Sequence, residues 1–209
     1  MAKDLSPKCK LCRRAGEKLI LKGERCKTTK CAMVKRNYPP GFHGPKNRKR
    51  LSDYGMQLNE KQKAKRQYNM LEKQFKLTFD KAKKSSGNLG ENFLQLLETR
   101  FDNVVYRLGI ASSRPQARQM IGHGLFTING KKVNIPSYIV KTGDIVEIKN
   151  NKKNAKIFSN LAERLKKQEI PGWLNFDFSK LAAKVLMQPE MKSFKPNFNV
   201  QIIVEYYSR

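Results

Sequence analysis

The four cysteines of the chain all lie within its first 31 residues, and their spacing limits how that segment can fold. They form a C-x2-C pair and a C-x4-C pair with 13 residues between them, at Cys9, Cys12, Cys26 and Cys31. Two close pairs joined by a short loop can place four thiolates tetrahedrally around Zn²⁺. The surrounding lysines and arginines favour the thiolate form. The pattern therefore predicts one structural zinc ion.

Two other interpretations of the cysteines stay open: small buried hydrophobic side chains, or a redox pair. Thioredoxin-type C-x-x-C chemistry occurs beside a βαβ unit, whereas Pro7-Lys8 and Arg13-Arg14 flank this motif. Four cysteines would complete the coordination shell of zinc and leave no position open for catalysis. The metal is expected to fold a segment too polar to fold alone, contributing roughly 10–16 kcal/mol as in zinc-finger peptides.

The chain carries a large excess of positive charge: 44 of its 209 residues are Lys or Arg and 17 are Asp or Glu, a net charge of +27. A small domain needs a net charge of only about 2–8 for solubility. The excess therefore indicates a polyanionic partner and disfavours an enzyme acting on a small neutral metabolite. Residues 1–66 hold 20 basic and 5 acidic residues, whereas residues 91–150 hold 8 and 5. We expect a basic N-terminal region built around the partner and then a more conventional module; a disordered basic tail is the alternative.

Membrane association is not expected. No run of 18 or more apolar residues occurs, and the basic N-terminus lacks the apolar core of a signal peptide. We therefore expect a cytoplasmic protein in a reducing environment, where cysteines do not form lasting disulfides.

Residues 37–51 are rich in proline and glycine, which disfavour regular structure. We expect an extended loop that can follow an irregular nucleic-acid backbone. The rings of Tyr38, Phe42 and His43 would be available to stack on an unpaired base or ribose. An ordinary interdomain linker would have the same composition.

A basic helix is predicted from Ser52, ending at residues 81–87. Its apolar stripe recurs at steps of three and four residues, at Tyr68, Leu71, Phe75 and Phe79. Lys61 and Lys65 would share one face and meet a phosphate backbone together, because few acidic residues lie nearby. A solvated basic face is the common alternative.

The segment from Asn88 has the pattern of two further helices. Asn88 caps the first, whose apolar stripe ends at Gly109. Ser113 caps the second, whose exposed edge would carry Arg114 and Arg118, four residues apart.

Strands are expected after these helices. Asn129-Gly130, between residues 125–128 and 131–134, is a strong hairpin signal, and residues 145–149 form a third strand. An amphipathic helix around Leu161 and Leu165 and a strand over residues 200–207 complete the chain. The predicted class is α+β: a mostly helical, basic N-terminal region with a four-cysteine zinc site, a small two-helix and β-hairpin RNA-binding module, and a C-terminal strand.

Several long stretches are more specific than any short motif: residues 51–63, 90–92 and 97–107, the Pro40–Gly44 loop, Asn129-Gly130 and residues 203–208. Across essentially the whole chain, the sequence closely resembles the bacterial small-subunit ribosomal protein number four family. The part from about Glu98 to Lys152 looks like the small RNA-binding domain of that family, which recurs in pseudouridine synthases and tyrosyl-tRNA synthetases.

The resemblance implies binding to the 5′ domain of small-subunit rRNA at a multi-helix junction, and nucleation of subunit assembly. It also implies a place near the mRNA entry channel and contacts with ribosomal proteins three and five. The interface with protein five affects decoding accuracy, and some members repress translation of their own operon. Members divide into those with and without a four-cysteine zinc site, and this sequence is similar to the zinc-bearing group.

We predict four segments: a zinc-binding extension and loop (1–50), a helical rRNA-binding region (51–97), the small RNA-binding module (98–160), and a C-terminal helix and strand that pack back on the body (161–209). The resemblance marks Arg107, Arg114, Arg118 and His123 as basic positions of the module. The candidate RNA-binding residues are Arg13, Arg14, Arg36, His43, Arg48, Lys49, Arg50, Tyr54, Lys61, Lys63, Lys65, Arg66, Tyr68, Arg107, Arg114, Arg118, His123 and Lys131.

Two other classes of function are alternatives to this interpretation. An RNA-modifying enzyme could carry the same module, but residues 151–209 are short for a catalytic domain, and neither His43 nor His123 lies near an obvious acid partner or nucleophile. A zinc-dependent DNA-binding regulator would need paired cysteine and histidine ligands or a helix that zinc ligands flank, and the sequence has neither. We predict a ribosome-bound, structural rRNA-binding protein, not an enzyme, whose affinity comes from counter-ion release and whose selectivity comes from shape.

Overall fold

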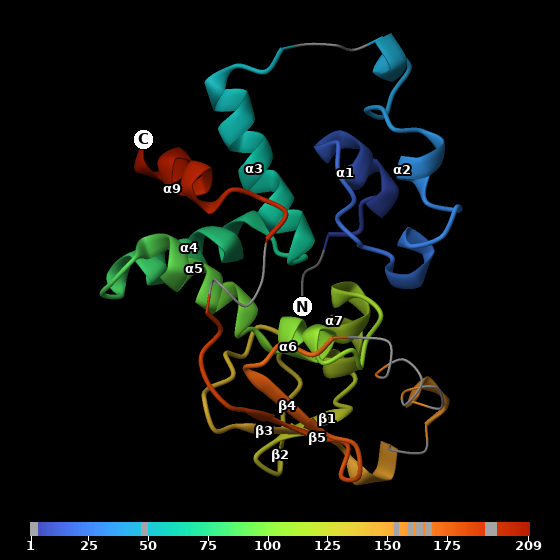
Figure 1. Cartoon of the computed structure of the whole chain (residues 1–209), viewed down its shortest axis with the longest axis vertical. Helices are drawn as coiled ribbons and strands as arrows, with labels where there is room; N and C mark the ends of the chain where they lie inside the picture. Colours follow the sequence, from blue (N-terminus) through green and yellow to red (C-terminus); the bar gives the residue numbers. More distant parts are fainter. Residues whose placement is uncertain are drawn as a thin grey trace. The chain divides into compact units, whose positions relative to one another are not determined.

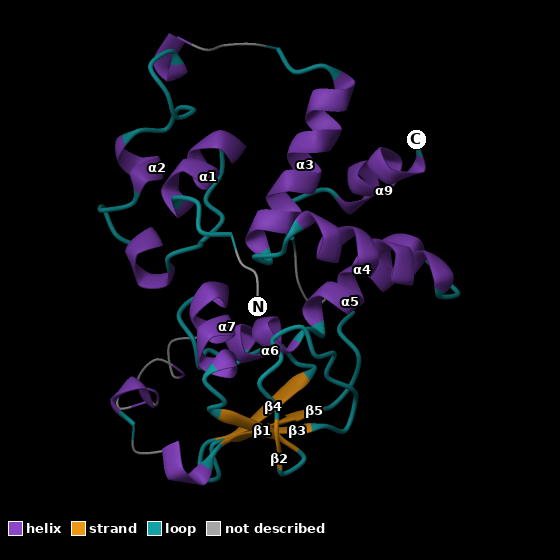
Figure 2. Ribbon diagram, turned by 180° about the vertical axis from the view of Figure 1, so that it is seen from behind, coloured by secondary structure: helices purple, strands orange, loops and turns teal. Residues whose placement is uncertain are grey.

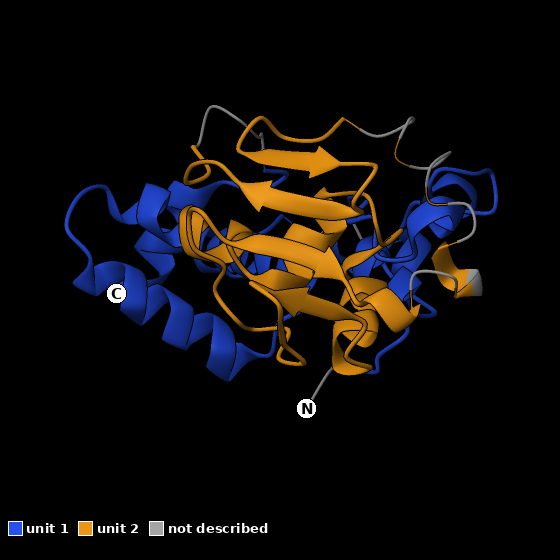
Figure 3. Ribbon diagram, turned by 90° about the horizontal axis from the view of Figure 1, so that it is seen from below, with its two compact units in different colours: residues 1–93, 196–209 blue, residues 94–195 orange. Residues whose placement is uncertain are grey.

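The computed structural model describes residues 4–46, 50–152, 155–158, 161, 165, 169–190 and 196–209. The chain divides into two compact units (Figure 3). The first unit contains residues 1–93 and 196–209, and the second unit contains residues 94–195. The two ends of the chain thus belong to the same unit, a grouping that cuts across the four segments predicted from the sequence.

The first unit begins with short helical elements around the cysteines (Figure 1). Helix α1 spans Lys8–Ala15, the 3-10 helix η1 spans Gly23–Cys26, and α2 spans Ala32–Lys35. Gly16 ends α1 with a φ of 74°, a left-handed conformation that glycine adopts without strain. These elements enclose a small hydrophobic core of Cys12, Ala15, Leu19, Leu21, Cys31 and Met33.

The sequence predicts one helix from Ser52 through the lysines near residue 84, but the structure has two. Helix α3 spans Asp53–Gln67 and α4 spans Glu72–Lys84. The chain turns at Asn69, whose φ of 52° lies in the left-handed region that asparagine tolerates better than most residues. The apolar stripe read from the sequence is therefore divided between this turn and α4.

The C-terminal strand predicted from the sequence is wrong, because Val200–Ser208 forms helix α9. The side chain of Asn199 caps this helix by accepting a hydrogen bond from the Gln201 N–H at 2.9 Å. Val200 and Ile203, three residues apart, are both buried, and α9 packs on α3. Burial of one helical face thus overrides the β propensity of this branched, aromatic run.

Aromatic rings join α4, α5 and α9 in the core of the first unit. Helix α5 spans Leu89–Glu98. The single helix predicted from Asn88 to Gly109 is wrong, because the extended backbone at Arg100 separates α5 from a second helix, Phe101–Arg107. The rings of Phe75 and Phe93 meet edge-on with centroids 5.2 Å apart, and those of Phe79 and Tyr207 lie 4.5 Å apart. The last helix of the chain is therefore part of the core of this unit.

The second unit is a five-stranded antiparallel sheet with two helices against it (Figure 2). The helices are α6 (Phe101–Arg107) and α7 (Arg114–Gly122). The strands, in the sheet order β2-β1-β3-β5-β4, are β1 (Phe126–Ile128), β2 (Lys131–Lys132), β3 (Ile145–Ile148), β4 (Leu174–Asp177) and β5 (Ala182–Val185). Two 3-10 helices, η3 (Asn150–Lys152) and η4 (Lys156–Phe158), follow β3.

The predicted hairpin is confirmed in this sheet. Asn129 and Gly130 both have positive φ, 50° and 76°, as a two-residue turn between twisted strands requires. Strands β4 and β5 were not predicted, because each is four residues long and no hairpin dipeptide joins them. The mixed composition confirms the predicted α+β class.

The predicted helix around Leu161 and Leu165 lies mostly outside the described residues. Both leucines are described, and both are buried in the core of the second unit with Phe126 and Trp173. Among the helices that the structure describes, none is long and apolar enough to cross a membrane.

The burial pattern of α9 gives a test of the corrected C-terminus. Ile203→Ala should lower the free energy of unfolding of the first unit by about 2–5 kcal/mol, because Ile203 is 0% exposed and truncation leaves a cavity. Gln201→Ala, on the exposed side of the same helix, is the control and should change it by less than about 0.5 kcal/mol. Urea unfolding followed by circular dichroism measures both, and equal effects would contradict the helical packing.

Candidate nucleic-acid interface

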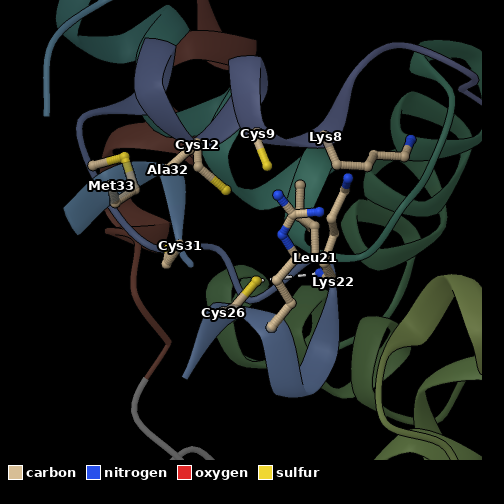
Figure 4. A pocket seen from close by; sticks show the side chains of 10 residues that line it. Lys8, Cys9, Cys12, Leu21, Lys22, Cys26, Cys31, Ala32 and Met33 are labelled. Atoms are coloured by element: carbon tan, nitrogen blue, oxygen red, sulfur yellow. Dashed lines mark hydrogen bonds between the residues drawn. The ribbon is translucent and has the colours of Figure 1, made fainter. Parts of the chain in front are cut away.

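The four cysteines surround one small pocket in the first unit (Figure 4). The first pair lies on α1, and the second pair stands at either end of the loop between η1 and α2. The pocket has a volume of about 20 Å³, enough for about one water-sized group. Lys8, Lys22 and Arg25 also line it. The structure therefore brings together four residues that the sequence predicted as one ligand set.

The donor set of this pocket suits zinc. Four thiols without a carboxylate or imidazole line it, which is the ligand set of a closed structural zinc site. Burial raises the pKa of the Cys12 thiol, and the other three cysteines add to this effect. The Lys22 N–H donates to Sγ of Cys26 at 3.3 Å, a bond that orients this thiol.

The four thiols lie too far apart for metal coordination. Among the residues that the structure describes, no group of three or more His, Cys, Asp or Glu side chains lies close enough together to hold a metal ion. Zinc binds sulfur at about 2.3 Å. Coordination would therefore require the four thiols to move closer together.

Arg13 on α1 holds the proline- and glycine-rich loop in place. Its Nε donates to the Tyr38 carbonyl oxygen at 2.9 Å, and its Nη2 donates to that of Pro39 at 3.3 Å. The guanidinium carbon lies 4.7 Å from the centroid of the Tyr38 ring, a cation–π contact. Arg13 thus positions the loop, and its guanidinium lies over the Tyr38 ring.

Lys61 and Lys65 do not form the open basic face expected from the sequence. Their Nζ atoms lie 2.6 and 2.8 Å from the two carboxylate oxygens of Glu72. The Lys61 side chain is 5% exposed, and its Nζ lies 4.7 Å from the ring centroid of Tyr206 on α9. The sequence reasoning missed Glu72 because it assumed one continuous helix, whereas the turn after α3 brings the start of α4 beside these lysines.

Lys63 is likewise engaged within the first unit. Its Nζ donates to Glu17 and Glu60, each at 2.7 Å. The other carboxylate oxygen of Glu60 accepts the Asn199 N–H at 2.9 Å. This cluster ties the N-terminal segment, α3 and the start of α9 together.

The remaining candidates of the first unit differ in exposure. Tyr54 is 51% exposed, Arg66 is half-buried, and Tyr68 is buried at 2% exposure, so Tyr68 serves the core. The exposed candidates are Arg14, Arg36, His43 and Arg50. Arg48 and Lys49 lie outside the described residues.

A buried carboxylate organises two predicted arginines of the second unit. Glu98, 0% exposed, accepts hydrogen bonds from Nε and Nη2 of Arg107 at 2.8 and 2.7 Å. It also accepts one from Nδ2 of Asn103 at 2.7 Å, and Oδ1 of Asn103 accepts one from Nε of Arg114 at 2.7 Å. The Arg114 guanidinium lies 4.5 Å from the Tyr106 ring centroid. Such a satisfied network fixes the positions of its arginines.

Asp102 forms a second cluster in the same unit. It pairs with Arg100 through two hydrogen bonds of 3.1 and 2.9 Å and lies 3.6 Å from Nη1 of Arg118. The exposed edge predicted for α7 is therefore wrong: Arg114 is buried at 6% exposure, the Arg118 side chain is 14% exposed, and polar groups of their own unit hold both. His123 and Lys131 are exposed.

The outward side of α4 is a basic surface that the sequence reasoning missed. Phe75, Phe79 and Ala82 are its buried residues, and their spacing was the signal that could have identified the opposite face. Asp80 is exposed on this helix. Five exposed lysines, here called the α4 lysine face, are Lys73, Lys76, Lys81, Lys83 and Lys84.

Two protein-family patterns match the chain: the ribosomal protein S4/S9 N-terminal domain over residues 3–98, and the S4 domain over residues 99–146. The chain is 53% identical to small ribosomal subunit protein uS4A of Alkaliphilus metalliredigens (strain QYMF). It is 51% identical to small ribosomal subunit protein uS4 of Caldicellulosiruptor saccharolyticus. Both alignments cover 209 residues and all of each chain. The chain belongs to the uS4 family.

The family predicted from the sequence is thereby confirmed. The uS4 family consists of structural proteins of the ribosome and not of enzymes. Its S4 domain, an RNA-binding domain, covers α6, α7, β1, β2 and the start of β3 in this chain. The clusters around Glu98 and Asp102 thus belong to, or border, the RNA-binding part of a uS4 chain.

The Glu72 cluster predicts a specific loss of stability in acid. Burial opposes ionisation, but hydrogen bonds from Lys61 and Lys65 lower the pKa of Glu72 below its ordinary value. A carboxyl group of this kind stabilises the fold above its unfolded pKa of about 4.3, and this is lost as pH falls through the lower folded pKa. Below about pH 4.3, wild type should therefore lose more stability than Glu72→Gln, which starts less stable at pH 7. Urea unfolding from pH 7 to pH 3 checks this, and parallel curves would contradict it.

Proposed function

We infer that this protein is a structural component of the small ribosomal subunit that binds small-subunit rRNA directly. The observation that carries the inference is that about half of the residues, over the full length of the chain, are identical to those of proteins named small ribosomal subunit protein uS4 or uS4A. The RNA-binding S4 domain pattern and the net charge of +27 support it. The protein would act in the cytoplasm, bound to the ribosome.

The surface offers a physical mechanism for this binding. Exposed lysines and arginines displace the counter-ions condensed on RNA, which supplies affinity without reading sequence. In the first unit such residues include the α4 lysine face and Arg14, Arg36 and Arg50. In the second unit, Glu98 and Asp102 fix the arginines in place, so that recognition can depend on the shape of the RNA.

The finer role follows from the resemblance of the sequence stretches described above. We propose that the rRNA target is a multi-helix junction in the 5′ domain and that binding there nucleates subunit assembly. In this proposal the protein lies beside ribosomal proteins three and five and near the mRNA entry channel, where contact with protein five would affect decoding accuracy. Repression of its own operon belongs to this proposal as well.

The α4 lysine face provides a test of the rRNA mechanism. The triple variant Lys73→Gln, Lys76→Gln, Lys84→Gln should bind a 5′-domain rRNA fragment more weakly. The plot of log K against log salt should lose about one unit of slope per phosphate contact removed. Filter binding over a series of salt concentrations would measure both quantities.

Two matched variants separate this effect from loss of folding. Asp80→Asn removes an acid from the same helix and should leave affinity equal or higher. Lys61→Gln should destabilise the first unit without changing the salt slope, because Lys61 is bound to Glu72. An unchanged slope in the triple variant would contradict a role of α4 in RNA binding.

The cysteine pocket would hold one structural zinc ion in this proposal. When bound, the metal would crosslink α1, η1 and the start of α2 through four thiolates. The six-residue core of this segment is small, and a metal crosslink would offset the entropy of ordering it. Zinc here would be a scaffold for the surrounding cations and not a catalyst.

Metal analysis of the purified protein tests the zinc proposal. We expect one zinc per chain in wild type and in Thr29→Ser, an exposed neighbour of the pocket that serves as control. Cys12→Ser should lose the metal and make residues 8–35 sensitive to protease, because folding of this segment is linked to metal binding. A metal-free wild type in which this segment resists protease would contradict the proposal.

A further inference from the structure

The loop between Tyr38 and Gly44 is fixed at its base. Arg13 donates to the carbonyl oxygens of Tyr38 and Pro39, and the Gly44 N–H donates to the Gly41 carbonyl oxygen at 3.1 Å. At Gly44 a Cβ atom would come within 2.0 Å of the Pro39 carbonyl oxygen, so only glycine fits there. Gly41 has a φ of 120°, which other residues rarely adopt. These contacts give the loop a defined conformation.

Phe42 lies at the tip of this loop and is 95% exposed. Of its neighbours, the His43 ring meets it edge-on with centroids 5.2 Å apart. Tyr38, in contrast, has the Arg13 guanidinium against its ring and is half-buried. Exposing an aromatic ring to water gives up the roughly 25 cal/mol per Å² that burial would supply, so this placement does not serve the fold. Of the three aromatic residues of the loop, Tyr38 is engaged by Arg13, whereas Phe42 and His43 are exposed and Phe42 is 95% exposed.

We propose that Phe42 stacks on an unpaired base of the ribosomal RNA. The proposal rests on the proposed function, because it needs RNA as the partner. Exposed cations lie near the loop in sequence, at Arg36, Lys46 and Arg50, and would contact the flanking phosphates. An aromatic ring on a fixed loop loses little freedom on binding and stacks on any base, since every base has a flat face.

An apolar pocket on a neighbouring protein is the competing partner for this ring. The charge around the loop argues against it. The interior of a protein interface is depleted of charged residues, whereas three exposed cations, Arg36, Lys46 and Arg50, lie within eight residues of Phe42 in the sequence. Stacking and insertion into a pocket also differ in what they require, because a base needs a flat aromatic face and a pocket needs only apolar volume.

Binding of the full chain to a 5′-domain fragment of small-subunit rRNA tests the proposal. Phe42→Ala should weaken binding roughly 5- to 100-fold, in line with the loss of one base stack. Phe42→Trp should bind as tightly as wild type, and Phe42→Leu should bind nearly as weakly as Phe42→Ala, because leucine has no flat π face. The salt slope should not change in any of the three variants, whereas Lys46→Ala should reduce it by about one.

Comparing the rRNA affinities of matched variants distinguishes stacking by Phe42 from other effects. Phe178→Ala removes another exposed phenylalanine, 55% exposed, and should leave affinity unchanged. Equal affinity of Phe42→Ala and wild type, or full binding by Phe42→Leu, would overturn the stacking proposal while leaving rRNA binding intact. Equal losses in Phe42→Ala and Phe178→Ala would overturn it too. Absence of rRNA binding by wild type itself would instead overturn the proposed function.

Discussion

Excess positive charge is the constraint on which the rest of this structure depends. With 44 basic and 17 acidic residues, cations repel one another unless carboxylates are placed between them. Glu60, Glu72, Glu98 and Asp102 are among the carboxylates that do this inside the two units. Glu72 and Asp102 each contact two basic side chains, and all four join residues from more than one local element. Removing one partner from a buried pair typically costs about 3–5 kcal/mol.

This use of the carboxylates sorts the cations into two groups. Lys61 and Lys63 are buried and hold helices of the first unit together. The α4 lysine face and the arginines near the cysteines and the loop point outward, where RNA phosphates can reach them. In the second unit, Arg107 and Arg118 are held by carboxylates and stay partly exposed, so they stabilise the fold and remain partly accessible from solvent. Composition alone does not distinguish these groups, because an ion-paired lysine and a solvated one are the same residue type.

In the first unit, the proline- and glycine-rich loop is held in a defined conformation by contacts with helix α1. Arg13 reaches from α1, the helix that carries Cys9 and Cys12, to the backbone of the proline- and glycine-rich loop. A metal that orders the cysteine segment would therefore also order the support of the loop. The tip residue Phe42 gains a fixed direction from this arrangement although it contributes little to the core.

The sequence by itself determined the family, the cysteine set, the Asn129-Gly130 hairpin and helix α7 with its Ser113 cap. These depend on residues close together in the chain, where turn chemistry, capping and spacing act directly. Only the tertiary structure decided that residues 200–208 form a helix, that the lysines of α3 face Glu72, and that β4 and β5 extend the sheet. Each of these depends on a partner distant in sequence or beyond a turn that a helical pattern does not reveal. Burial against α3 outweighs the β propensity of the C-terminus, and a left-handed Asn69 brings a carboxylate to lysines that otherwise read as an open basic face.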